Sequence, residues 1–260
     1  MKILVVLKMV PDVVEELVLD PSGRSLDLDA IRMTLNGSDD DALEEALLLK
    51  ERSGAAVTVV AGDAPEVDDA LFTALAKGAD RAVRVVWPDG PVSTRATGHM
   101  LAALLRDNPS LWPADLILTG TQASDDLDGL LTPALARSLD LPWLSVITRI
   151  GANLEKRVVR VVKEFSGGVR ADFDIPMPCV LGVQAAEKPP RYVPVAKVRA
   201  AMKSQAIDTV DAPGVPGEPV MVETLAMSMP LATNMARMLD GSPERVSEEL
   251  CGIFAARGLL

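Results

Sequence analysis

Carboxylates and glycines gather in one loop of the chain. Asp125, Asp126 and Asp128 lie between Gly120 and Gly129, and a predicted helix follows them. Carboxylates at this spacing can bind a cation or exchange protons, although such a loop is more often a turn with a helix cap. The two glycines allow a ligand to approach the backbone, and amides at a helix N-terminus can receive a phosphate. The composition therefore favours a nucleotide-binding loop over a catalytic one.

Elsewhere the chain shows few groups with catalytic potential. His99 is the only histidine, and Cys179 and Cys251 lie far apart in the sequence. They form no zinc-binding pattern and no disulfide framework, which favours a reducing compartment. Neither a Gly-x-Gly-x-x-Gly fingerprint nor a Gly-x-x-x-x-Gly-Lys-Ser/Thr loop occurs. We therefore expect no catalytic residue, no metal site and no enzyme activity of this chain by itself.

The composition narrows the classes of partner. The 260 residues include 37 acidic and 26 basic side chains, which gives a net charge of −11. Such a surface repels a nucleic-acid backbone, and four Phe, three Trp and one Tyr are too few for base-stacking platforms. The first residues are too short an apolar run for a signal peptide, and no run approaches the roughly 20 residues that span a bilayer. We expect a cytoplasmic protein with no nucleic-acid partner and no membrane insertion.

A regular alternation of strands and helices positions the loops. Continuous β-branched and aliphatic runs predict buried strands at residues 3–7, 56–60, 82–86 and 116–118. Helical segments are predicted at residues 39–52, 67–77, 93–105 and 130–139. Ser38 is the expected N-cap of the first helix, ahead of an acidic first turn. The alternation predicts right-handed crossovers and a doubly wound, mostly parallel, Rossmann-like α/β sheet.

Two other regions depart from this alternation. Residues 17–28 carry an Asp-Pro-Ser-Gly turn between short alternating runs and predict a hairpin. The long runs 154–165 and 169–183, separated by Ser166-Gly167-Gly168, predict an antiparallel addition to the sheet.

The sequence of the last part of the chain predicts an arm. Residues 185–219 lack core-like periodicity and predict an irregular segment, which is an arm, a lid or a partner-binding loop. Residues 223–260 contain two amphipathic helical patterns, with Ser242 as N-cap and Pro243 as the first residue of the second. We therefore expect a nucleotide-binding domain at residues 1–188, followed by a recognition loop and a C-terminal arm with helices at residues 189–260.

Several blocks of sequence, in order, resemble one known family. They include Met-Lys-Ile-Leu-Val-Val-Leu-Lys at 1–8, Val-Pro-Asp at 10–12, Leu-Asn-Gly-Ser-Asp-Asp-Asp-Ala-Leu-Glu-Glu-Ala at 35–46, and Ala-Leu-Ala-Lys-Gly-Ala-Asp-Arg-Ala at 74–82. The loop from Asp115 to Asp126, Val-Lys-Glu at 162–164 with Gly-Gly at 167–168, Pro-Cys-Val at 178–180 and Lys-Pro-Pro-Arg-Tyr at 188–192 continue the match. Together these blocks resemble the β subunit of electron transfer flavoprotein.

The resemblance implies an electron carrier. In that family an α subunit holds most of the redox FAD, while the β subunit supports it and buries an AMP. Electrons arrive from flavin dehydrogenases, such as acyl-CoA dehydrogenases, and pass to a quinone reductase. Some members bifurcate electrons with a second FAD in place of AMP, and this alternative stays open, as does a stand-alone adenine-nucleotide-binding sensor module that shares the fold.

The resemblance also assigns site residues by position. The implied nucleotide-binding residues are Val6, Asn36, Gly37, Ser38, Asp39, Gly62, Asp63, Leu118, Thr119, Gly120, Thr121, Gln122, Ser124, Asp125, Asp126, Gly129, Leu130 and Leu131. The implied partner-docking residues are Pro190, Arg191, Tyr192, Val193, Pro194, Val195, Ala196 and Lys197. Val195 stands where relatives present an apolar anchor, usually Leu.

Four positions depart from the family pattern. Leu130 and Leu131 stand where many relatives have Gln and a small polar residue, so backbone amides would have to hold the phosphate. Ser38 stands where several relatives carry an aromatic residue facing the flavin, and Val13 where some carry Tyr. The resemblance therefore implies little direct contact between this chain and the FAD ring.

Overall fold

The computed structural model describes residues 1–87, 93–214, 224–229 and 236–260. The strands are β1 (Lys2–Leu7), β2 (Met9–Pro11), β3 (Met33–Leu35), β4 (Ala56–Gly62), β5 (Arg81–Val86), β6 (Leu116–Gly120), β7 (Trp143–Asn153), β8 (Val158–Glu164), β9 (Arg170–Pro176), β10 (Cys179–Val183) and β11 (Ile207–Asp211). The helices are α1 (Gly37–Ser53), α2 (Val67–Lys77), α3 (Thr94–Asp107), α4 (Leu131–Leu139), α5 (Val195–Ser204) and α6 (Pro243–Ala256).

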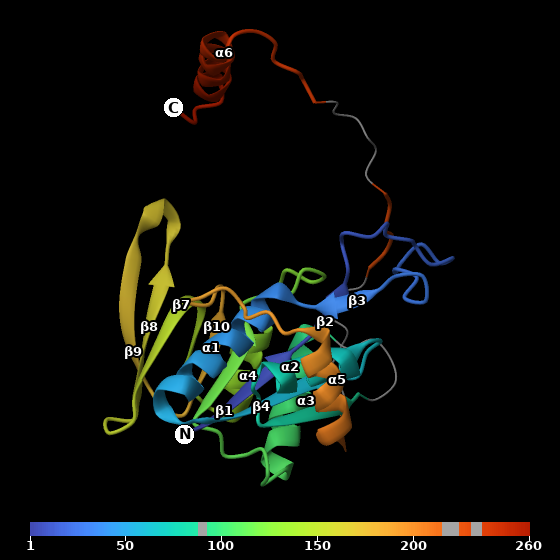
Figure 1. Cartoon of the computed structure of the whole chain (residues 1–260), viewed down its shortest axis with the longest axis vertical. Coiled ribbons are helices and arrows are strands. Elements are labelled where there is room, and N and C mark those ends of the chain that lie inside the picture. Colours follow the sequence, from blue (N-terminus) through green and yellow to red (C-terminus); the bar gives the residue numbers. More distant parts are fainter. Residues whose placement is uncertain (88–92, 215–223, 230–235) are drawn as a thin grey trace.

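A nine-stranded sheet organises the described residues (Figure 1), in the order β11-β5-β4-β1-β6-β10-β7-β8-β9. The strands from β11 to β7 are parallel, whereas β8 is antiparallel to both of its neighbours, β7 and β9. A separate small sheet joins β2 to β3. This architecture confirms the predicted doubly wound, mostly parallel α/β fold with an antiparallel addition. All four predicted strands and the four predicted helices of the alternation are present, with ends shifted by two residues or fewer.

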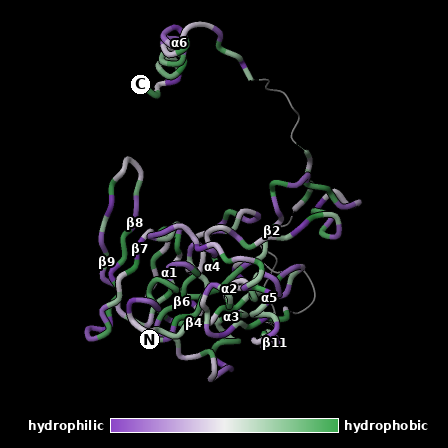
Figure 2. Tube along the Cα trace, viewed as in Figure 1, coloured by the Kyte–Doolittle hydropathy of each residue, from purple (hydrophilic) through white to green (hydrophobic). Residues whose placement is uncertain are grey.

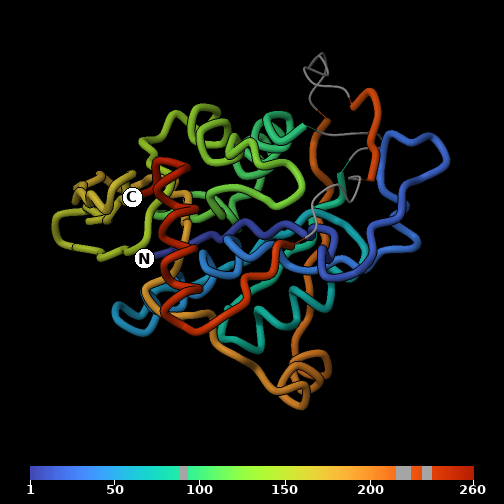
Figure 3. The backbone as a smooth tube through the Cα atoms, turned by 90° about the horizontal axis from the view of Figure 1, so that it is seen from above, coloured from blue at the N-terminus to red at the C-terminus, as the bar shows by residue number. Residues whose placement is uncertain are grey.

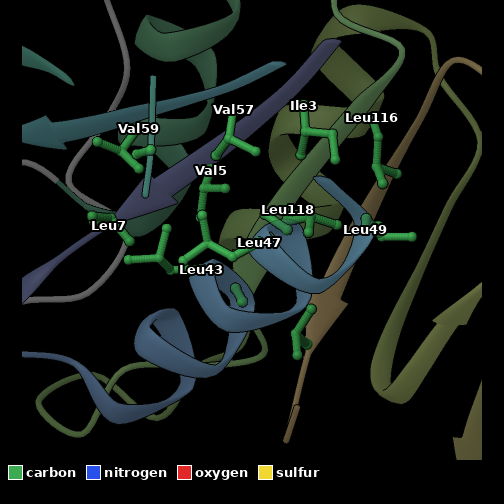
Figure 4. Close-up of a cluster of buried hydrophobic side chains, with 14 of the residues drawn as sticks. Ile3, Val5, Leu7, Leu43, Leu47, Leu49, Val57, Val59, Leu116 and Leu118 are labelled. Atoms are coloured by element: carbon green, nitrogen blue, oxygen red, sulfur yellow. The ribbon is translucent and has the colours of Figure 1, made fainter. Parts of the chain in front are cut away.

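The central strand is buried on both faces, as its continuous apolar sequence predicts. Ile3, Val5 and Leu7 pack into one core layer with α1 and α2, and Figure 4 shows them facing Leu43 and Leu47 of α1. The alternate residues of β1 pack into the opposite layer with α3 and α4. Replacing a fully buried leucine in these layers with Ala costs about 2–5 kcal/mol in stability.

The order of the strands places a topological switch point beside β1. From β1 the chain proceeds to β4 and β5 on one side, and then returns to β6 on the other side. The loops that leave β1 and β6 at their carboxyl ends therefore diverge in opposite directions. A crevice at such a point is the usual ligand site of a doubly wound sheet.

One strand of the antiparallel region was predicted wrongly. The run 169–183 forms two strands, β9 and β10, because Pro178 has no N–H for a sheet hydrogen bond and the chain turns there. Only β9 is antiparallel, while β10 enters the parallel sheet between β6 and β7. In Figures 1 and 3 the β7–β9 extension and the excursion between β2 and β3 lie at opposite ends of the molecule.

The predicted irregular segment after residue 185 contains regular structure. Helix α5 packs against α2, and β11 pairs in parallel with β5 at the edge of the main sheet. The expected domain boundary after residue 188 therefore does not coincide with the end of the sheet. Sequence periodicity missed β11 because an edge strand buries little, and Asp208, Thr209 and Asp211 are exposed.

The hairpin predicted at residues 17–28 is reduced to a single antiparallel bridge between Leu19 and Leu26. The tail crosses this excursion, because the Met227 amide donates to the Gly23 carbonyl at 2.8 Å. In Figure 2 the excursion carries both hydrophobic and hydrophilic residues.

Helix α6 stands away from the rest of the chain (Figure 1) and buries no residue. Ser242 caps it, accepting a hydrogen bond from the Arg245 amide, and Pro243 begins it, so the sequence prediction is confirmed. The first predicted tail helix is not formed at residues 224–229 or 236–240, and its remaining positions lie outside the described residues. Among the described helices, none is long and apolar enough to cross a membrane.

Candidate functional site

A cavity of about 540 Å³ opens at the carboxyl edge of the parallel sheet. The ends of β1, β4 and β6 contribute to it, together with the loop that leads into α4. Its volume lies in the range of small-molecule sites, roughly 300–1,000 Å³. It occupies the switch point between β1 and β6, where the fold is expected to bind a ligand.

Two thirds of the nucleotide-binding residues expected from sequence line this cavity. They are Val6, Asn36, Asp39, Gly62, Asp63, Gly120, Thr121, Gln122, Asp126, Gly129, Leu130 and Leu131. Six expected residues do not line it: Gly37, Ser38, Leu118, Thr119, Ser124 and Asp125. Leu118 and Thr119 are fully buried inside β6, and Asp125 is engaged by a lysine at the rim.

The structure adds lining residues that the resemblance did not assign by name, although Asp128 belongs to the carboxylate loop noted in the sequence. They are Leu7, Lys8, Met9, Leu28, Val60, Ala64, Trp87, Thr94, Thr97, Leu101, Ala123 and Asp128. Trp87 directly follows β5, so the rule that ligands bind beyond strand carboxyl ends would have indicated it. Leu101 and Thr97 lie in α3 and have no comparable sequence signal.

Lys8 forms ion pairs with two of the aspartates that could otherwise bind a metal or exchange protons. Lys8 Nζ lies 2.7 Å from an oxygen of Asp125 and 2.9 Å from an oxygen of Asp126. Burial acts to lower the pKa of Lys8, but the two carboxylates together outweigh burial and raise that pKa. Among the described residues no acidic, histidine and cysteine side chains cluster as a metal site. The two aspartates thus join the β6 loop to the end of β1.

Asp39 fixes the floor of the cavity. Its carboxylate accepts hydrogen bonds from the Gly120 amide at 2.7 Å and from the Lys8 amide at 2.9 Å, so one side chain joins β6, β1 and the first turn of α1. Burial raises the pKa of Asp39 to about 7, although these amides oppose the rise. The expected Ser38 cap was wrong, because Asn36 is the N-cap residue and donates its side-chain amide to the Gln122 carbonyl.

Gly120 is required for the close approach of α1 to β6. A Cβ atom at this position would lie 2.3 Å from Asp39 Oδ1 and 2.9 Å from Ser38 Cβ. A side chain there would therefore displace the start of α1.

At the α4 end of the cavity, a carboxylate already occupies an anion-binding position. Asp128 Oδ1 accepts a hydrogen bond from the Leu130 amide at 2.9 Å, and Asp126 Oδ1 accepts one from the Asp128 amide. Leu130 and Leu131 extend this side of the cavity with apolar surface. The acidic and apolar side chains at this end therefore provide no hydrogen-bond donor for a phosphate.

Outside the cavity, the outer face of α1 holds the segment that leads to α5. The Glu44 carboxylate accepts hydrogen bonds from the Arg191 amide and guanidinium at 2.8–3.1 Å, and Arg191 also reaches Glu51 at 2.7 Å. Burial acts to raise the pKa of Glu44, but Arg191 more than compensates and lowers it. Two further carboxylates of α1, Asp41 and Glu45, accept the amides of Ala186 and Glu187. These contacts hold residues 186–191, the segment that leads to α5, against α1.

Comparison with known proteins identifies the chain. A family model described as the electron transfer flavoprotein domain matches residues 26–214. The chain belongs to the electron transfer flavoprotein family. It is 31% identical over 232 residues to the electron transfer flavoprotein subunit beta of Clostridium acetobutylicum, which covers 86% of each chain. The corresponding subunit of Methylophilus methylotrophus is 33% identical over 209 residues, 77% of this chain and 76% of that one. That of Bacillus subtilis is 27% identical over 260 residues, 98% and 97%.

Membership in the electron transfer flavoprotein family confirms the resemblance drawn from sequence blocks and implies a role in electron transfer in association with a flavin. Family members of this kind are electron-carrier subunits rather than catalytic ones. His99 Nδ1 bonds Ser138 Oγ between α3 and α4, and burial raises the pKa of Cys179 to about 12, which makes its thiol unreactive.

The residues expected to dock a partner lie on and before α5. Tyr192 is 84% exposed and Val195 is 62% exposed, so both apolar side chains face solvent. Val195 is the first residue of α5, and Pro194 is its N-cap, so the expected loop becomes helical at this point. Arg191 is turned toward α1 instead, where it anchors the segment.

Proposed function

We propose that this chain is the β subunit of a heterodimeric electron transfer flavoprotein that binds AMP in the cavity at the carboxyl edge of its sheet. The flavin of the heterodimer is an FAD held mainly by the α subunit, and it accepts and donates the electrons. The chain docks flavin dehydrogenases, such as acyl-CoA dehydrogenases, and the electrons continue to a quinone reductase. The observation that carries this proposal is the cavity at the switch point, lined by twelve of the eighteen residues expected from the family resemblance.

The cavity fits an adenine nucleotide by its shape and walls. It is large enough for a nucleoside monophosphate, and apolar side chains such as Val6, Val60 and Leu101 offer a surface for a base. Gly120, Thr121 and Gln122 present backbone groups from the β6 loop. AMP would have a structural role there, because the described lining residues include no histidine or cysteine and their only lysine is paired with two aspartates.

A second FAD in place of AMP, as in bifurcating members, is the alternative for this cavity. Its pyrophosphate would carry more negative charge to a lining that contains Asp63, Asp126 and Asp128. The only positively charged residue among the described lining residues, Lys8, is already paired with two carboxylates. This distribution of charge favours AMP over FAD.

The C-terminal arm favours a subunit over a stand-alone sensor module. Helix α6 buries nothing within the described chain, and Leu250 and Phe254 are partly exposed on it. A sensor that functions without a partner has no use for such a helix, whereas a subunit that wraps its α partner does. We assign the residues after β11 to this arm. Both cysteines are free thiols, which suits the cytoplasm as the compartment.

Native mass spectrometry of the protein from its own host, with the released small molecules identified, tests the proposal. We expect a heterodimer with one FAD and one AMP. Two FAD molecules would replace this proposal with a bifurcating flavoprotein. A monomer or homodimer that carries only an adenine nucleotide would instead identify a sensor module.

Replacing Val195 with Asp tests the docking surface. We expect slower electron acceptance from the dehydrogenase, by roughly tenfold, because a charge enters an apolar contact worth about 1–2 kcal/mol. Heterodimer assembly and flavin content should stay unchanged, because Val195 lies on exposed surface of this chain. The measurement is the rate of flavin reduction at a series of dehydrogenase concentrations.

The matched control is Ala206→Asp, which adds the same charge at an exposed position beyond the other end of α5. It should leave the rate of flavin reduction unchanged. Loss of FAD from the Val195→Asp protein would contradict the assignment of this residue to dehydrogenase docking.

A further inference from the structure

One end of the cavity carries an aromatic residue that the family resemblance did not assign. Trp87 follows β5 and lines the cavity beside Val60 and Leu101. Its indole is partly buried and packs against the core layer of α3 and α4. A rigid aromatic ring at a cavity wall is a stacking surface for a planar base, because every base has a π face.

The neighbouring strand is adapted to this indole. A Cβ atom at Gly62, on β4, would lie 2.1 Å from Trp87 Nε1 and 2.8 Å from its Cε2. Only glycine therefore lets the ring lie across the end of β4. The cavity needs Trp87 and Gly62 together in order to present this surface.

The opposite end of the cavity lies across β4 and β1, at β6 and α4. Three strand spacings separate β5 from β6, roughly 14 Å, which is the scale of a nucleoside monophosphate laid across the strand ends. A base on Trp87 would thus direct its phosphate toward the β6 loop.

That end of the cavity is electrostatically unfavourable to phosphate. Asp126 and Asp128 line it, and Asp128 already holds the Leu130 amide. Lys8, the one cation among the described lining residues, is neutralised by two aspartates. Each added phosphate would therefore bring negative charge toward carboxylates, and the described lining residues offer no unpaired cation to balance it.

We propose that the cavity selects its ligand by the purine base, which stacks on Trp87, and that each phosphate on the ligand weakens binding. This inference rests on the proposed adenine-nucleotide site and specifies its ligand class: a purine nucleoside with one phosphate at most. Adenosine then binds at least as tightly as AMP, and ADP binds about tenfold more weakly than AMP. Ribose 5-phosphate, which lacks the base, does not bind.

Isothermal titration calorimetry tests these affinities on the full chain, produced together with its partner subunit and freed of bound nucleotide. The probes are adenosine, AMP, ADP and ribose 5-phosphate. Trp87→Ala should lower the affinity for adenosine and the affinity for AMP equally, by about tenfold, which is the scale of one lost stacking contact. Trp87→Phe keeps an aromatic ring and should retain most of the affinity.

Two further variants separate the base from the phosphate. Trp143→Phe changes an exposed tryptophan outside the cavity and should alter no affinity. Asp128→Asn removes one negative charge while its Oδ1 can still accept the Leu130 amide, so it should strengthen AMP binding several-fold and leave adenosine binding unchanged.

Labelling with 5-fluorotryptophan gives a direct readout. The ¹⁹F resonance that disappears in Trp87→Phe should shift with adenosine and with AMP, and should not shift with ribose 5-phosphate. Gly62→Ala should move the same resonance in the absence of ligand, because its added methyl displaces the indole.

The outcomes distinguish this inference from the proposed function. The inference is wrong, while the AMP site stands, if AMP binds more than tenfold tighter than adenosine. The same holds if Trp87→Ala binds adenosine with the affinity of the unmodified chain. If the unmodified chain binds neither adenosine nor AMP, both the inference and the proposed nucleotide site are wrong.

Discussion

Helix α1 contacts two parts of the molecule through different interactions. One part is the strand ends beneath the cavity, and the other is the segment that leads to α5. At its first turn one buried carboxylate, Asp39, accepts hydrogen bonds from two backbone amides. Along its outer face, Glu44 and Glu51 bind Arg191, whose side chain is 30% exposed. Buried, directional hydrogen bonds therefore fix the cavity, whereas the segment that leads to α5 depends on an arginine that solvent and salt can reach.

Gly120→Val should disturb the first of these contacts most. Its Cβ would overlap the Asp39 carboxylate and approach the backbone of α1, so we expect a loss of about 3 kcal/mol or more in the free energy of unfolding. Urea denaturation followed by circular dichroism measures the loss. Gly37→Ala is the matched control, because an added methyl there meets no atom within 4 Å. Equal stability of the two variants would refute the close approach of α1 to β6.

Asp39→Asn should cost about 2 kcal/mol, because its NH2 group would face a backbone N–H in place of one accepted hydrogen bond. The cost should depend on pH. The folded chain binds a proton at Asp39 up to about pH 7, whereas an unfolded Asp releases it near pH 4, so this carboxyl stabilises the folded chain less as pH rises from about 4 to 7. Asn does not titrate.

Denaturation at pH 5, 6, 7 and 8 measures this dependence. The difference in stability between the unmodified chain and Asp39→Asn should be largest at pH 5 and should shrink toward pH 8. Asp69→Asn, at an exposed position of α2, is the control and should show no such trend. A difference that grows with pH would contradict a raised pKa at Asp39. Burial also raises the pKa of Glu45 to about 7, so some pH dependence should persist in the variant.

Arg191→Ala should have the smallest effect on global stability, about 1 kcal/mol, because removal of its partly exposed side chain lets water reach Glu44. Its local effect should be larger. We expect faster hydrogen exchange at the amides of residues 186–191, and we expect 0.5 M salt to produce part of the same change in the unmodified chain. Arg199→Ala, on the exposed surface of α5, is the control and should change neither the global stability nor the hydrogen exchange of residues 186–191. Unchanged exchange in Arg191→Ala would show that Asp41 and Glu45 hold the segment without it.

Sequence reasoning found the parallel core because its signals are strong and local. Continuous apolar runs such as 3–7 and 56–60 are required of strands buried on both faces, and helical periodicity fills the intervals between them. It missed β11, whose residues are half exposed, and it merged β9 with β10. Both errors concern strands whose place is decided by distant partners, namely β5 for one and β6 for the other.

The cavity was predictable in outline and not in its chemistry. Strand ends and glycines indicated where it would lie, and the family pattern supplied half of its described lining. The contacts that define it join residues far apart in sequence: a hydrogen bond links Asp39 with Gly120, an ion pair links Lys8 with Asp126, and the Trp87 indole packs on Gly62. No spacing rule relates such pairs, so the structural role of Asp39 and the pairing of Lys8 emerge only from the folded chain.

The position of β10 has a consequence for how the chain folds during synthesis. β10 lies between β6 and β7, yet it is made after both of them and after the whole β7–β9 meander. The meander therefore emerges from the ribosome with no strand to join, while the edge of β6 stays open. Pairing of Leu116 with Cys179 then closes the sheet in its middle, as a late and non-local step. Until that step, the apolar edge of β6 is the part of the nascent chain most in need of protection from aggregation.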